Sequence, residues 1–117
     1  MGQENVVYFA ENEEELVNLL FGLGIKRNVA RVLVLLVKTP MITSRAIAKG
    51  TDLRHLEVVT VIYYLKKQGW IKSQGRPRKI YELAKPIAEI VNGIEKEKIK
   101  KANDQLQLIQ KLRNCVS

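Results

Sequence analysis

Very few side chains in this sequence belong to the types that perform catalysis. Its 117 residues include one histidine, His55, and one cysteine, Cys115. A catalytic histidine needs a nucleophile or a carboxylate beside it, and no such pattern accompanies His55. A zinc site needs several cysteine and histidine ligands, and one residue of each type is too few. The segment Gly22-Leu23-Gly24 predicts a helix end, because a phosphate-binding glycine loop follows a strand and has more glycines. The sequence therefore predicts no enzyme, metal or cofactor.

The chemistry that remains is electrostatic. The first twenty residues contain five glutamates and no lysine or arginine, so the other 97 residues hold all 20 cations against seven acids. Such an excess favours a polyanionic partner, with nucleic acid first and an anionic membrane surface second. One short segment combines several cations with turn residues, namely Arg76, Arg78 and Lys79, with Lys72 nearby. A basic hairpin tip can follow a DNA backbone or enter a narrow minor groove, although a solvated basic turn is the alternative.

Residues 39–83 contain the elements that would position these cations. Gly75 and Pro77 make the segment between the two predicted strands a turn, and apolar and polar residues alternate in the strands themselves. The order is that of a winged helix-turn-helix, a mainly α fold with a small β-hairpin. The predicted elements are a helix over Ser44–Lys49 capped by Thr43, a turn at Gly50, a helix from Leu53 under an Asp52 or Thr51 cap to Gln68, and strands over Trp70–Ser73 and Lys79–Leu83.

Two helices precede this segment. The first is predicted over Glu13–Leu23 with Asn12 as its N-cap, and the second over Arg27–Lys38. Residues 1–85 are therefore expected to form one winged-helix domain, and residues 86–117 a C-terminal helix. The predicted apolar faces are Leu16, Leu19, Leu20 and Leu23 on the first helix, and Val29, Val32, Leu33, Leu36 and Val37 on the second.

The helix predicted from Pro86 onward is longer than the domain needs. Its apolar residues recur at spacings of three and four and form a stripe that requires a partner. A second copy of the chain is the expected partner, and a fold-back of the helix onto its own domain is the alternative. The residues predicted to make the dimer are Ile87, Val91, Ile94, Ala102, Leu106 and Ile109.

The helix over Leu53–Gln68 is the presumed recognition helix. Its side chains Leu56, Val59 and Tyr63 form a second apolar stripe, beside the buried face expected from the spacing of the others. The first helix, a partner subunit or thymine methyl groups are three explanations for that stripe. The residues predicted to contact DNA are Thr43, Ser44, Arg45, Arg54, His55, Thr60, Tyr64, Lys67, Lys72, Arg76, Arg78 and Lys79.

The order of these parts resembles the TrmB-type winged-helix regulators of archaea and bacteria, and more distantly the MarR-like regulators. The residues that carry the resemblance are Leu23-Gly24-Ile25, the segment Tyr64–Ile71 and the Gly75-Arg76-Pro77 tip. The resemblance covers about two thirds of the chain and implies a short, stand-alone member that dimerises through terminal helices. Full TrmB regulators carry a sugar-binding domain that has no counterpart here, so no effector is predicted.

The expected function is sequence-specific binding of double-stranded DNA by a homodimeric transcriptional regulator. The alternative is a winged helix that mediates protein–protein contacts in a transcription or RNA-processing assembly, which the stripe Leu56-Val59-Tyr63 favours. The single cysteine rules out an internal disulfide and suits a reducing cytoplasm. No run approaches the ~18–20 apolar residues of a membrane span, and the acidic N-terminus does not resemble a signal peptide. We therefore expect a cytoplasmic protein that does not enter membranes.

Overall fold

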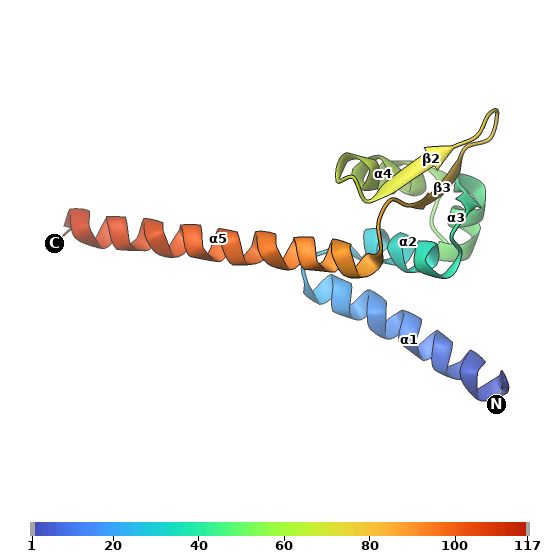
Figure 1. Cartoon of the computed structure of the whole chain (residues 1–117), viewed down its shortest axis with the longest axis horizontal. Helices are drawn as coiled ribbons and strands as arrows, with labels where there is room; N and C mark the ends of the chain where they lie inside the picture. The colour runs from blue at the N-terminus through green and yellow to red at the C-terminus, as the bar shows by residue number, and fades with distance from the viewer. Residues whose placement is uncertain (1, 117) are drawn as a thin grey trace. The chain divides into compact units, whose positions relative to one another are not determined.

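The computed structural model describes the main chain of residues 2–116 and the side chains of residues 12–116 (Figure 1). The chain forms two compact units, Met1–Lys85 and Pro86–Ser117. The expected fold class, a mainly α winged helix with a long C-terminal helix, is confirmed. The elements are α1 (Gly2–Gly22), α2 (Arg27–Lys38), β1 (Ile42–Thr43), α3 (Ser44–Thr51), α4 (His55–Lys67), β2 (Ile71–Gln74), β3 (Ile80–Leu83) and α5 (Ile87–Val116).

The core of the first unit is built around α2. Val32 and Leu33 are fully buried there, and α2 packs against α1, α3, α4 and β3. The spacing of three and four residues predicted this buried face of α2, and it also predicted the buried face of α4. The buried side chains from the other elements are Leu20, Ile25, Ile42, Ile47, Val58, Val61, Ile62, Leu65 and Ile71.

A three-stranded antiparallel sheet in the order β1-β3-β2 completes this unit. β2 and β3 form the hairpin, called the wing below, with Ser73 opposite Tyr81. Their predicted bounds were wrong by only one residue. β1 was not predicted, because two residues are too few to show an alternating pattern. Its Thr43 pairs with Ile80, and this pairing attaches the start of α3 to the base of the wing.

The predicted start of the first helix was wrong. α1 begins at Gly2, and Asn12 lies within the helix instead of capping it. No proline or glycine interrupts residues 3–21, so nothing in that segment stops a helix before Asn12. Of the predicted apolar face, Leu20 is buried but Leu19 is exposed, as is Val37 of the facing helix α2. α1 is held to α2 by an ion pair of 3.0 Å between Glu13 and Lys38.

The turn between α3 and α4 was also predicted in the wrong place. Gly50 lies within α3, and Asp52 makes the turn with a φ of 59°. Thr51 does not cap α4, because its hydroxyl donates to the Ile47 carbonyl at 2.7 Å inside α3. Asp tolerates the left-handed region better than most residues, so the chain reverses at Asp52. α4 therefore begins at His55, two residues later than predicted.

Candidate nucleic-acid interface

The start of α3 and the wing together enclose a basic cavity, which we call the notch. The pairing of β1 with β3 brings these two segments to the same place although they lie about thirty positions apart in the sequence. The notch has a volume of about 380 Å³. The residues that line it are Thr43, Ser44 and Arg45 from the start of α3, and Pro77, Arg78, Lys79 and Tyr81 from the wing.

The notch combines three cations with hydroxyl groups. Arg45, Arg78 and Lys79 are exposed, and no described residue that lines the cavity is acidic. Thr43 has a structural task, because its hydroxyl oxygen accepts a hydrogen bond of 3.2 Å from the Ala46 amide and caps α3. Exposed cations beside a hydroxyl are the groups that contact phosphate oxygens in protein–DNA complexes. The chemistry of the notch therefore suits a phosphate group.

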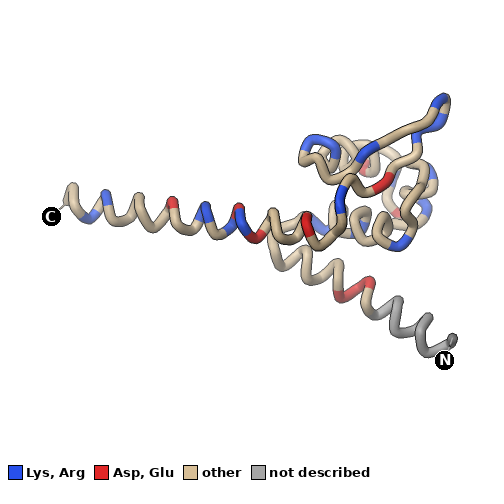
Figure 2. Tube along the Cα trace, viewed as in Figure 1, with Lys and Arg blue, Asp and Glu red and all other residues tan. Residues whose placement is uncertain are grey.

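The tip of the wing extends the basic surface beyond the notch. Arg76 is exposed there, and Figure 2 shows the cations gathered on this hairpin. Gly75 shapes the tip with a φ of 99°, and a Cβ at this position would lie 2.7 Å from the Arg78 carbonyl oxygen. Lys72 is placed differently from the other predicted cations, because its ammonium group lies 3.3 Å from the Glu82 carboxylate on the neighbouring strand. Part of its charge is thus neutralised within the protein.

The exposed side of α4 carries a row of residues that points away from the core. Each helical residue advances about 100°, so the side opposite the buried Val58 and Leu65 contains Leu56, Thr60, Tyr63 and Lys67. We call these four residues the outer row. Leu56 is 77% exposed and Tyr63 is 70% exposed. The prediction from sequence included Thr60 and Lys67 among the DNA contacts, and it left the first helix, a partner subunit or thymine methyl groups as explanations for Leu56 and Tyr63. The spacing of positions 56, 60, 63 and 67, alternately four and three residues, is the signal that could have grouped these four side chains.

The other predicted residues of α4 lie at its ends and side. Arg54 and His55 are exposed at the start of the helix. Tyr64 lies on the side of α4, where its ring meets the Trp70 ring edge-on with a centroid distance of 6.0 Å. This packing leaves 38% of Tyr64 exposed. Tyr64 thus packs at the end of α4, beside the start of β2. At the other end of α4, the side chains of Arg54 and His55 are exposed to solvent.

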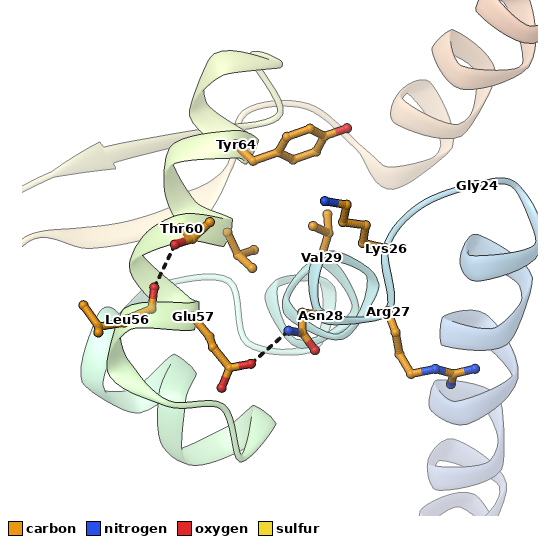
Figure 3. A pocket seen from close by; sticks show the side chains of 10 residues that line it. Gly24, Lys26, Arg27, Asn28, Val29, Leu56, Glu57, Thr60 and Tyr64 are labelled. Carbon is orange, nitrogen blue, oxygen red and sulfur yellow. Dashed lines mark hydrogen bonds between the residues drawn. The ribbon is translucent and has the colours of Figure 1, made fainter.

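A groove separates the start of α2 from α4 (Figure 3). It has a volume of about 690 Å³, and a hydrogen bond of 3.2 Å crosses it from the Asn28 amide nitrogen to the Glu57 carboxylate. The second carboxylate oxygen of Glu57 accepts from the Arg54 main-chain amide at 3.1 Å. Glu57 therefore caps α4 and ties it to α2, which fixes the position of α4. The sequence analysis did not assign this task, although a glutamate at the third position of a helix is a known capping signal.

Replacing Glu57 with alanine should lower the free energy of unfolding by about 1–2 kcal/mol, because one cap and one partly buried hydrogen bond are lost together. Chemical denaturation followed by circular dichroism measures this change. Glu89 is the matched control, since it is an exposed glutamate in the first turn of α5. The Glu89→Ala variant should change stability by only a few tenths of a kcal/mol. Equal effects of the two substitutions would contradict the assigned task of Glu57.

The predicted dimer residues of α5 divide into two groups. Ile87, Val91 and Ile94 are half-buried, whereas Ala102 and the residues after it are exposed. Leu106 and Ile109 are 60% and 45% exposed, and Leu112 and Val116 continue the same apolar stripe. We call the exposed stripe from Ala102 to Val116 the seam. The second half of α5 thus presents an exposed apolar stripe beside Arg113.

Other kinds of site find no support in the described part of the chain. None of the helices there is long and apolar enough to cross a lipid bilayer. No group of three or more histidine, cysteine, aspartate or glutamate side chains among residues 12–116 is arranged to hold a metal ion. Cys115 is exposed near the end of α5.

No family model matches the sequence, and no curated protein matches it. Solved structures do match. TrmBL2, described as an archaeal chromatin protein with a novel mode of DNA binding, has a TM-score of 0.76 at 19% identity over 87% of this chain. The ST1889 protein from the archaeon Sulfolobus tokodaii has a TM-score of 0.62 at 19% identity, covering 80% of this chain and 93% of its own. A possible transcriptional regulator from Methanosarcina mazei has a TM-score of 0.58 at 16% identity, covering 84% of this chain and 86% of its own.

The chain spans 39% of the length of TrmBL2, so the likeness concerns one part of that protein. Other matches include a transcriptional regulator with a TM-score of 0.59 and a probable transcriptional regulator from Pseudomonas aeruginosa with a TM-score of 0.53. Sequence identities of this size establish the fold alone. The chain has the winged-helix fold of these solved structures.

Proposed function

We propose that this protein is a DNA-binding transcriptional regulator that acts as a homodimer in the cytoplasm of a prokaryote. The observation that carries the proposal is the notch, where Arg45, Arg78 and Lys79 from two distant segments line one cavity. The solved structures support it, because their descriptions name transcriptional regulators and a chromatin protein that binds DNA. Each protomer would hold backbone phosphates in its notch and place α4 in the adjacent major groove.

The dimensions of the parts fit this arrangement. A major groove about 12 Å wide admits one α-helix, and α4 presents the outer row on its exposed side. Arg76 is exposed at the tip of the wing, from where it would reach the flanking backbone or the narrow minor groove. Lys67 at the end of α4 would contact a further phosphate. Occupancy of the DNA site would then block or recruit the transcription machinery.

Dimerisation through the seam would pair two such domains about a twofold axis. Leu106, Ile109 and Leu112 are all exposed within one chain. Two paired copies of α5 would bury these side chains against each other. A twofold dimer reads two half-sites about one helical turn apart, roughly 34 Å. The preferred DNA site would accordingly be an inverted repeat.

Binding should weaken steeply with salt, because each phosphate contact releases counterions. Arg45, Arg76, Arg78, Lys79 and Lys67 of two protomers would make about ten contacts, which corresponds to a slope of log affinity against log salt of about −9. Affinity for a duplex should fall by about 10⁵ between about 50 and 200 mM salt. Fluorescence anisotropy with a labelled genomic fragment, titrated at several salt concentrations, measures this salt dependence of the affinity.

One alternative remains supported by a specific observation. The exposure of Leu56 and Tyr63 favours a winged helix that docks onto another protein. The explanation that the first helix covers this stripe was wrong, because both side chains are exposed in the first unit, which includes α1. The salt titration separates the two functions, since an interaction module would bind no duplex, or would bind it with little dependence on salt.

A further inference from the structure

The outer row of α4 offers DNA few hydrogen-bond donors. Two of its four members, Leu56 and Tyr63, are the most exposed large apolar side chains of this helix. The hydroxyl of Thr60 donates to the Leu56 carbonyl at 2.9 Å, so its single proton is already used. Thr60 therefore presents a methyl group and oxygen lone pairs. Leu56, Thr60 and Tyr63 therefore offer guanine no bidentate donor, and the charged groups that could do so, on Arg54 and Lys67, lie only at the two ends of the helix.

The charges around the row indicate which partner covers it. Lys67 belongs to the row, and Arg54 and His55 lie at its other end. Glu57 is the only acid from residue 54 to residue 68, and its carboxylate is held by Asn28 and the Arg54 amide. An apolar strip bounded by cations, with its one carboxylate engaged, complements an anionic duplex better than an apolar protein surface.

In the major groove, the C5 methyl of thymine is the apolar group on the edge of a base pair. We propose that Leu56 and Tyr63 recognise thymine methyl groups, so that each half-site has an A·T-rich centre. This inference rests on the proposed function and specifies the class of DNA sequence that the regulator prefers. The methyl contacts supply the specificity, and the notch supplies affinity that does not depend on sequence.

Replacing thymine with deoxyuridine tests the proposal, because it removes the C5 methyl and leaves base pairing intact. A duplex selected from a random pool should be bound about tenfold more weakly when two thymines of one half-site become deoxyuridine, since one buried methyl contributes about fourfold. The same change in the flanking base pairs should have no effect. The Leu56→Ala/Tyr63→Ala variant should bind both duplexes equally, whereas Leu56→Met, which keeps an apolar side chain of similar volume, should retain the preference.

The outcomes distinguish this inference from the proposed function. Equal affinity of the unaltered protein for the thymine and deoxyuridine duplexes would overturn the methyl readout while leaving DNA binding in place. A preference for thymine that persists in the Leu56→Ala/Tyr63→Ala variant would also overturn it, because other residues would then read the methyl groups. Failure to bind any duplex would refute the proposed function itself.

Discussion

Replacing Leu106 and Ile109 with aspartate should convert the protein into a monomer and lower its affinity for a DNA site with two half-sites by about 10² to 10⁴. Both side chains lie in the exposed apolar seam of α5. A buried aspartate on each helix would place unpaired charges in the dimer interface, which is strongly unfavourable. Without the dimer, the second half-site is no longer bound as an intramolecular event, and the gain from linkage disappears.

Light scattering and DNA titration measure the two consequences separately. The mass in solution should fall from twice 13.4 kDa to the 13.4 kDa of one chain. The matched control replaces Gln107 and Asn114 with aspartate, which makes the same change of charge on the side of α5 away from the seam. That control should remain a dimer. If the Leu106→Asp/Ile109→Asp variant also remains a dimer, the seam is not the dimer interface.

Alanine at Arg45, Arg78 and Lys79 should lower DNA affinity by at least about 10²-fold at moderate salt and make the salt dependence much weaker. Six phosphate contacts of the dimer would be lost, so the slope should move from about −9 to about −4. The loss should be nearly the same for every duplex, because phosphate contacts carry no sequence information. The three side chains are exposed, so the fold should be unchanged.

The control for this variant must remove the same charge elsewhere. Lys96, Lys100 and Lys111 are exposed on the side of α5 opposite the seam, and alanine at all three should change affinity only slightly. A similar loss of affinity in both variants would mean that overall charge, and not the notch, attracts the DNA. Retention of full binding by the Arg45→Ala/Arg78→Ala/Lys79→Ala variant would instead favour the protein-interaction alternative.

Most of the fold could be predicted from the sequence because its determinants are local. The periodic apolar residues of α2 and α4 and the turn residues Gly75 and Pro77 identify helices and a hairpin without knowledge of the rest of the chain. The errors occurred where one weak local signal competed with another. Gly50 is a common turn residue, yet Asp52 makes the turn, because Gly50 lies in α3 close to the side chain of Leu35.

The candidate interface was harder to predict, because it depends on contacts between distant segments. The list of cations was available from the sequence, but the grouping of Arg45 with Arg78 and Lys79 required the pairing of Thr43 with Ile80. The exposure of Leu56 could not be decided from the sequence either, because the first helix, a partner subunit or DNA could each cover an apolar stripe on this helix. Sequence patterns report which residues are apolar, and only tertiary structure shows which of them remain uncovered.

The two-residue ladder between β1 and β3 has a consequence for how this protein can evolve. Main-chain hydrogen bonds, which do not depend on side-chain identity, set the span between the cations of α3 and those of the hairpin. Substitutions at these cationic positions can therefore raise or lower the affinity for a nucleic acid without changing the distance between the backbone phosphates that the protein binds. Affinity and the spacing of the bound phosphates can thus change independently.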